Sequence, residues 1–215
     1  MDILNEIYFN EGMKVIGITG RSASGKGTVA EYLVERYGYT HLSVRKVIKE
    51  EVKKELGRDS QSRDELIDIA NLIRERHGAD YFVLKLYEQA KELGQDCIIE
   101  SIRTVGEVEA LREKADFLLL AVDAPLELRY ERVETNNREE IENEISFEEF
   151  KAQDLRENTS ELKTIQNISK CVLMADAVIG NDWEDDIEAL HKEIDIVMEV
   201  LNENKEGKII SEKEA

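Results

Sequence analysis

The chain has 215 residues, which is enough for one α/β domain with a full hydrophobic core but short for two independent domains. Hydrophobic residues make up 41% and charged residues 36% of it, a balance that is too apolar for a disordered chain. The formal net charge of −19 argues against broad electrostatic binding of nucleic acid or of anionic membranes, because both require clustered Lys and Arg.

Short apolar runs alternate along the chain with longer stretches of helical period, which is the pattern of a parallel sheet flanked by helices. Five runs are predicted to be strands: residues 13–19 (MKVIGIT), 39–43, 96–100 (DCIIE), 116–122 (DFLLLAV) and 175–180 (ADAVIG). Right-handed crossovers between them would bring their carboxyl ends, and a ligand site with them, to one edge of the sheet.

The predicted helices have recognisable start signals. A Ser or Thr three positions before a Glu forms a capping box, and three such pairs precede helical stretches: Ser62 with Glu65, Thr104 with Glu107, and Ser146 with Glu149. A helix is also expected at residues 26–37, and the last one, from about residue 183 to 201, has an apolar stripe at helical spacing. We expect one domain over residues 1–204 and a charged, disordered tail at residues 205–215.

A glycine loop, residues 20–28 (GRSASGKGT), lies between a predicted buried strand and a predicted helix, which is the context of a phosphate-binding loop. Glycines let the backbone turn so that its N–H groups converge on phosphate oxygens, and the helix that follows adds its positive end. Lys26 would supply a mobile charge for the β- and γ-phosphates of ATP. The predicted donor ligands are Gly20, Ser22, Ala23, Ser24, Gly25, Lys26, Gly27 and Thr28.

The residue after Lys26 is informative. It is Gly27, where the strict pattern has a Ser or Thr that holds Mg²⁺, and the hydroxyl comes one place later at Thr28. This GKGT form resembles that of adenylate kinases. The resemblance implies Mg²⁺ held largely through water, with Thr28 as a phosphate ligand and an optional metal ligand.

Charged residues near the strand ends predict the acceptor side, because phosphoryl transfer depends on positioning and positive charge. Arg63 and Arg74 lie eleven residues apart on one predicted helix, which places them on one face about 16 Å apart. They would bind an anionic acceptor or simply be solvated. Glu100 and Arg103 follow the third strand, where Glu100 could organise Mg²⁺ and Arg103 could reach an acceptor phosphate. The alternative is a plain ion pair at a strand end.

A helical insert between the fourth and fifth strands, at residues 136–157, is predicted to be a lid. Arg132 precedes it, and Arg138 and Arg156 lie within it. A closing lid would exclude water, which competes with the acceptor for the phosphoryl group. The alternative is a solvated helical pair.

Together these residues resemble the nucleoside monophosphate kinase superfamily from about residue 13 to residue 198. Ser43, which ends a His-Leu-Ser stretch, and Lys49 look like its acceptor-binding segment, in which an arginine usually replaces Lys49. Residues 100–103 (ESIR) look like its Asp-Gly-x-x-Arg segment, and the three arginines of the lid region look like its lid arginines. A closer resemblance is to kinase-like domains, related to dephospho-CoA kinase, that occur alone or fused to deoxycytidylate-deaminase-type domains.

We therefore expect a three-layer α/β P-loop NTPase fold, with about five parallel strands, that transfers a phosphoryl group from ATP to a nucleoside or deoxynucleoside monophosphate. The expected catalytic residues are Lys26, Arg103, Arg132 and Arg156, and Arg132 would also contact ATP. The expected acceptor ligands are Ser43, Lys49, Arg63, Arg74, Arg103 and Arg138, and the expected Mg²⁺ ligands are Thr28 and Glu100.

Two alternatives stay open. A dephospho-CoA kinase would place a carboxylate base after the second strand, and residues 43–46 (SVRK) contain none. A nucleotide-binding regulatory protein with weak ATPase activity would not need the arginines that suit an acceptor.

Cysteine usage and hydropathy bear on location. Cys97 and Cys171 lie inside apolar runs and form no metal-binding spacing, which indicates buried residues in a reducing compartment. No run approaches the roughly 20 apolar residues of a membrane span, and residues 1–11 are acidic, unlike the start of a secretion signal. We expect a cytoplasmic protein whose partner is a small phosphorylated acceptor, without nucleic acid or membrane partners, and with a homodimer left open.

Overall fold

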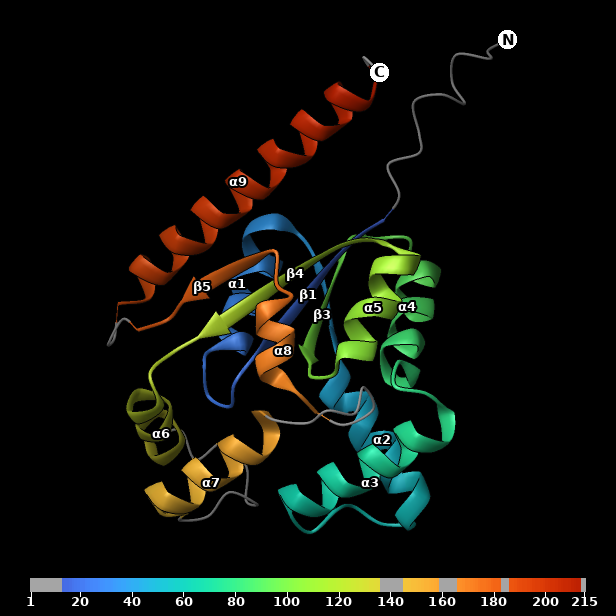
Figure 1. Cartoon of the computed structure of the whole chain (residues 1–215), viewed down its shortest axis with the longest axis vertical. Coiled ribbons are helices and arrows are strands. Elements are labelled where there is room, and N and C mark those ends of the chain that lie inside the picture. Colours follow the sequence, from blue (N-terminus) through green and yellow to red (C-terminus); the bar gives the residue numbers. More distant parts are fainter. Residues whose placement is uncertain (1–12, 136–144, 159–165, 183–185, 214–215) are drawn as a thin grey trace.

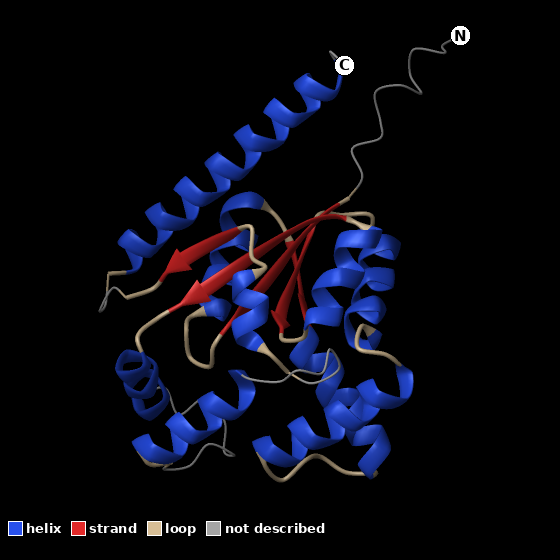
Figure 2. Cartoon of the chain, viewed as in Figure 1, coloured by secondary structure: helices blue, strands red, loops and turns tan. Residues whose placement is uncertain are grey.

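The computed structural model describes residues 13–135, 145–158, 166–182 and 186–213, without the side chains of Arg63 and of residues 202–213. Five parallel strands form one sheet in the order β2-β3-β1-β4-β5 (Figure 2). Their bounds are β1 Lys14–Gly20, β2 Thr40–Ser43, β3 Cys97–Ile102, β4 Asp116–Asp123 and β5 Ala177–Gly180. The predicted α/β class and five-stranded parallel sheet are confirmed.

Helices cover both faces of the sheet because β1 alternates its apolar side chains between two cores. Val15 packs with α2 Val44–Leu56, α4 Tyr81–Leu93, α5 Val105–Lys114 and α8 Ile168–Leu173. Ile16 and Ile18 face the opposite way, against α1 Lys26–Tyr37 and α9 Ile187–Lys213. The sheet is therefore the central one of three layers.

Three further helices lie beyond the carboxyl ends of the strands (Figure 1). Helix α3 Arg63–His77 is on the side of α2, and α6 Leu126–Thr135 and α7 Phe147–Asn158 are on the other side. The three predicted capping residues, Ser62, Thr104 and Ser146, each accept a hydrogen bond from the backbone N–H three residues on. The predicted helix starts are thus confirmed. The first part of the predicted lid, residues 136–144, lies outside the described residues.

Helix α9 continues to Lys213 and so includes most of residues 205–215, for which a disordered tail is predicted. Residues 202–213 (NENKEGKIISEK) are rich in Glu and Lys and contain no proline, so helix propensity favours continuation.

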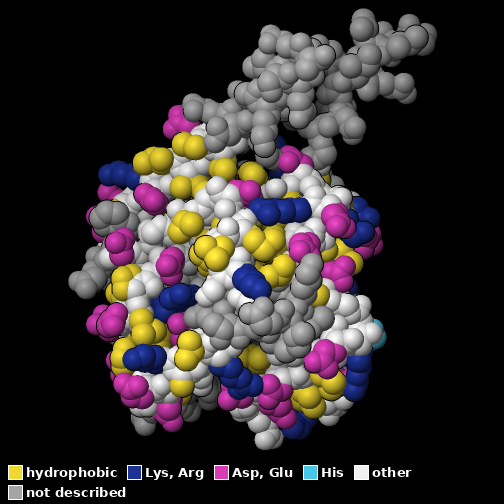
Figure 3. Space-filling model, in the orientation of Figure 1, with side chains coloured by type: hydrophobic (Ala, Val, Ile, Leu, Met, Phe, Trp, Pro, Cys, Tyr) yellow, Lys and Arg dark blue, Asp and Glu magenta, His cyan; other side chains and the backbone are white. Residues whose placement is uncertain are grey.

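Surface charge and hydropathy follow the composition. On the face shown in Figure 3, Lys and Arg side chains are interspersed with Asp and Glu. Within the described part of the chain, none of the helices has the length and hydropathy to cross a membrane.

Candidate functional site

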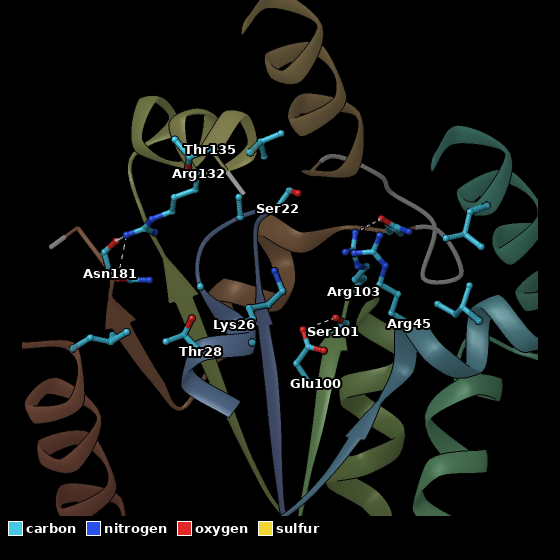
Figure 4. Close-up of a pocket in the computed structure, with 18 of the residues that line it drawn as sticks. Ser22, Lys26, Thr28, Arg45, Glu100, Ser101, Arg103, Arg132, Thr135 and Asn181 are labelled. Atoms are coloured by element: carbon cyan, nitrogen blue, oxygen red, sulfur yellow. Dashed lines mark hydrogen bonds between the residues drawn. The ribbon is translucent and has the colours of Figure 1, made fainter. Parts of the chain in front are cut away.

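The candidate site lies where the connections leave the middle of the sheet in opposite directions. Strand β1 is flanked by β3 and β4, and a topological switch of this kind leaves a crevice at the carboxyl ends of the strands. A cavity of about 750 Å³ opens there. One part of its wall comes from the phosphate loop, α6, residue 181 and the start of α9, and another part comes from α2, α3 and the end of β3 (Figure 4).

Two glycines of the phosphate loop have backbone conformations that require glycine. Gly20 has φ 139° and Gly25 has φ 97°, both in the region that L side chains rarely adopt. A Cβ at Gly20 would collide with the carbonyl oxygen of Val122, and one at Gly25 with the amide group of Asn181. Gly27 has open space around it, so no contact requires glycine at that position.

Six of the eight predicted donor residues of the loop line the cavity: Ser22, Ala23, Gly25, Lys26, Gly27 and Thr28. The other two do not line it: Gly20 lies against the backbone of Val122 in β4, and Ser24 is fully buried. The Nζ of Lys26 donates a hydrogen bond to the carbonyl of Arg21 at 2.6 Å and is therefore held within the loop. The loop thus presents backbone, the hydroxyls of Ser22 and Thr28, and one ammonium group to the cavity.

Asn181, which directly follows β5, joins the phosphate loop to α6. Its Nδ2 donates to the carbonyl of Ser24 at 2.8 Å, and its backbone N–H donates to the carbonyl of Asp123 at 2.8 Å. The Nη2 of Arg132 donates to the backbone carbonyl of Asn181 at 3.1 Å and to its Oδ1 at 3.3 Å. Arg132, one of the predicted donor ligands, lines the cavity beside the loop. Sequence reasoning missed Asn181, although its place at the end of a strand was the available signal.

Arg129 is a second residue whose role the sequence did not indicate. It is fully buried, and its Nη1 donates to the carbonyl of Ser22 at 3.2 Å. The same guanidinium forms two hydrogen bonds with Asp154 of α7, at 2.7 and 3.2 Å. Arg129 thus fixes the phosphate loop to both α6 and α7.

Glu100 sits at an irregular point in β3. Ile18 pairs with Glu100 but Thr19 pairs with Ile102, so Ser101 is an extra residue that bulges from the ladder. Ser101 has φ 76°, and its Oγ donates to Glu100 Oε1 at 2.7 Å. A positive φ at this position is a conformation that glycine adopts more readily than serine.

The Glu100 carboxylate is held in its charged form. Burial alone would raise its pKa, but the neighbouring His41 imidazole, a hydrogen bond from Ser101 and the positive charge of Lys26 lower the pKa to about 2. The Nε2 of His41 lies 3.8 Å from Glu100 Oε2. The cavity therefore contains a permanent anion near the phosphate loop at neutral pH.

Magnesium would fit beside this anion. Glu100 and Thr28 both line the cavity and offer the hard oxygen ligands that Mg²⁺ prefers. The described residues contain no cluster of three or more His, Cys, Asp or Glu, so the nucleotide and water would complete the coordination.

The wall opposite the loop combines arginines with an aliphatic surface. Arg45 from α2 and Arg103 from the end of β3 both line it (Figure 4). Arg103 Nη1 donates to Glu157 Oε2 at 2.7 Å and to Gln166 Oε1 at 3.4 Å. The aliphatic lining consists of Ile48, Leu66, Ile67 and Ala70. Arg45 is a new candidate, whereas the predicted Ser43 and Lys49 are not among the lining residues.

The prediction that Arg74 is an acceptor ligand is wrong. Its side chain is fully buried and forms an ion pair with the equally buried Glu107 at 3.1 Å. The guanidinium lies over the ring of Phe82, 4.9 Å from its centroid. The Arg74 side chain therefore lies against Glu107 of α5 and Phe82 of α4, where no ligand can reach it.

The remaining predicted arginines have different positions. Arg156 is half-exposed and forms ion pairs with Asp64, at 2.9 Å, and Asp68 of α3 instead of lining the cavity. Arg138 and the side chain of Arg63 lie outside the described residues.

Comparison with known proteins assigns the chain to a family. Residues 16–161 match the family described as AAA domain. A UPF0200 protein from Pyrobaculum aerophilum is 31% identical over 187 residues, which cover 86% of this chain and 97% of the relative. A UPF0200/UPF0201 protein from Archaeoglobus fulgidus is 32% identical over 84% of this chain, and the match spans only 54% of that longer relative.

Solved kinase structures share the fold. A shikimate kinase from Bacteroides thetaiotaomicron matches with a TM-score of 0.57 and 11% identity, covering 88% of this chain and 99% of that one. A dephospho-CoA kinase from Campylobacter jejuni matches with a TM-score of 0.50 and 18% identity, covering 90% and 100%. The fold is therefore that of the P-loop kinases, and the chain belongs to the AAA-domain family and to the UPF0200 proteins.

Proposed function

We propose that this protein is an ATP-dependent phosphotransferase that acts on a nucleoside or deoxynucleoside monophosphate. The observation that carries the proposal is the composition of one cavity, which has a phosphate loop on one side, two arginines beside an aliphatic wall on the other, and Glu100 between them. A site for triphosphate hydrolysis alone would not need the second, arginine-containing wall.

On the donor side, the loop amides and Lys26 would hold the phosphates of ATP. A bound phosphate would offer the Lys26 ammonium a charged partner in place of the Arg21 carbonyl, and charge-assisted hydrogen bonds are the stronger kind. Arg132, positioned by Asn181, would neutralise charge that develops on the transferred group.

Magnesium, when bound, would draw electron density from the phosphate oxygens of the donor. Glu100 would hold it through water or directly, and Thr28 would add a hydroxyl. Because its pKa is about 2, Glu100 stays an anion through the physiological pH range and does not need to lose a proton before binding the cation.

The charges that line the cavity bear on the chemistry of the acceptor. A hydroxyl acceptor needs a base to take its proton. A phosphate monoester is already anionic at neutral pH and needs none. Arg45 and Arg103 would hold such an anion. The aliphatic side chains of α2 and α3 would pack against the apolar face of a nucleobase. This combination supports a nucleoside monophosphate as the acceptor.

The test is ATP consumption against a panel that separates phosphate acceptors from hydroxyl acceptors. The first group is the ribo- and deoxynucleoside monophosphates, and the second is dephospho-CoA and shikimate. We expect at least one nucleotide to raise turnover about a hundredfold, as acceptor positioning should, and no hydroxyl acceptor to do so. Product identification by phosphorus NMR distinguishes transfer from hydrolysis.

Variants assign the two sides of the cavity. Lys26→Ala should abolish turnover, whereas Lys192→Ala, an exposed lysine on α9, should not change it. Arg103→Ala and Arg45→Ala should lose acceptor-dependent turnover while ATP binding changes little. If no acceptor raises turnover although ATP binds, the proposal is wrong and the alternative of a nucleotide-binding regulator is favoured.

A further inference from the structure

One turn of α7 contacts three parts of the site. Asp154 binds Arg129, which in turn holds the phosphate loop through Ser22. Arg156 forms ion pairs with α3, and Glu157 reaches Arg103 at the end of β3. Helix α7 is therefore anchored independently of Glu157, by contacts with α6 and with α3.

The contact between Glu157 and Arg103 has an unusual position for an ion pair. The Glu157 side chain is only 4% exposed, and its Oε2 lies 2.7 Å from Arg103 Nη1. Arg103 is 15% exposed and lines the cavity, whereas Glu157 does not. A buried carboxylate thus binds a guanidinium that lines the cavity.

A guanidinium binds carboxylates and phosphates through the same N–H geometry, so the two anions can exchange on one arginine. A buried carboxylate also keeps Arg103 in place and lowers its net charge in the absence of ligand. The cavity side of Arg103 is therefore less attractive to an anion than an uncompensated arginine would be.

We propose that Glu157 is an internal competitor for the acceptor anion and sets the specificity of the site for phosphate monoesters. This inference rests on the proposed function. A dianionic phosphate draws the Arg103 guanidinium away from Glu157, whereas a monoanionic or neutral acceptor does not compensate for the lost ion pair. Because α7 is held by Asp154 and Arg156, the exchange requires only rotation of the Glu157 and Arg103 side chains.

The experiment measures binding of inorganic phosphate, with the phosphate loop saturated by a non-hydrolysable ATP analogue and Mg²⁺. Glu157→Gln keeps the shape of the side chain and removes its charge. The matched control is Glu148→Gln, an exposed glutamate on the same helix. We expect Glu157→Gln to bind inorganic phosphate about tenfold more tightly, since a charged hydrogen bond no longer competes, and Glu148→Gln to match the unsubstituted protein.

Two further measurements separate competition from a purely structural role. In turnover, Glu157→Gln should lower KM for the nucleotide without raising kcat, and it should reduce the preference for a phosphate over a carboxylate ligand. In an Arg103→Ala background, Glu157→Gln should leave phosphate affinity unchanged, because the group that it competes for is absent.

Weaker or unchanged phosphate binding by Glu157→Gln would overturn the inference and make Glu157 a residue that orients Arg103. If that variant does not fold, Glu157→Asp, which withdraws the carboxylate by one methylene, must also bind phosphate more tightly, and a failure to do so overturns the inference equally. The phosphate titration does not depend on turnover. The absence of any acceptor activity would therefore refute the proposed function alone, and unaltered phosphate binding in an active enzyme would refute the competition alone.

Discussion

Replacement of Arg74 by methionine is expected to destabilise the fold without weakening acceptor binding. Arg74 and Glu107 are both fully buried, and their side chains are 3.1 Å apart. Arg74→Met removes the cation and leaves the carboxylate in the core, where an uncompensated charge is strongly unfavourable.

The expected loss of stability depends on the hydrogen bonds that Glu107 keeps in the variant. Breaking a buried ion pair by removing one partner costs about 3–5 kcal/mol. Glu107 Oε2 still accepts hydrogen bonds from the backbone N–H groups of Arg103, at 2.8 Å, and Thr104, at 3.0 Å, which stabilise the remaining charge. We therefore expect the lower end, about 3 kcal/mol, which for a domain of this size lowers Tm by roughly 6–12 °C.

The assay is thermal and urea unfolding, combined with acceptor KM. Arg76→Met, an exposed arginine on the same helix, is the matched control and should change stability by less than about 0.5 kcal/mol. The double variant Arg74→Met with Glu107→Gln should be more stable than Arg74→Met alone, because no charge is left unpaired. An unchanged Tm together with a tenfold higher acceptor KM would refute this reasoning and restore Arg74 as a substrate ligand.

Three further predictions concern the loop and β3. Asn181→Ala should weaken ATP binding about tenfold, as expected for the loss of a hydrogen bond to the loop and of the support for Arg132, and calorimetry would contradict this if the affinity were unaltered. Ser101→Val should lower stability by about 2 kcal/mol and Ser101→Gly by less than about 1, because φ is 76° there; equal effects in urea unfolding would argue against strain. The folded-state pKa of Glu100 is lowered from 4.5 to about 2, so its carboxylate stabilises the fold above pH 4.5, and this contribution is lost as the pH falls through 2. As the pH falls from 4.5 to 2, the free energy of unfolding of the unsubstituted protein should decrease by roughly 3 kcal/mol more than that of Glu100→Gln. Parallel curves of stability against pH for the two proteins would contradict this prediction.

The strands and the loop were predictable because their signals are local. A buried parallel strand is a short apolar run. Strand β1 is shifted by one residue from its predicted range, and β4 is one residue longer than predicted at its carboxyl end. The phosphate loop is contiguous, so its glycines and Lys26 could be assigned without knowing how the rest of the chain packs. Capping boxes likewise act within four residues of the chain.

The pairing of charged side chains was not predictable, because it depends on which helix face is buried. Helical spacing placed Arg74 on a defined face, but only the packing of α3 against α5 showed that this face meets Glu107 rather than the cavity. The same limit applies to Arg45, which lines the cavity in place of the predicted Lys49.

The amino-acid sequence by itself therefore determined the parallel α/β class and the phosphate loop, and it predicted that Glu100 and Arg103 lie near the carboxyl end of the third strand. Only the tertiary structure decided which arginines face the cavity, that Asn181 and Arg129 support the loop, and that Glu157 holds Arg103. The physical reason is the separation along the chain of the residues that interact. Backbone periodicity and loop geometry arise from neighbouring residues, whereas the Glu157–Arg103 pair joins groups 54 positions apart that only the completed fold brings together.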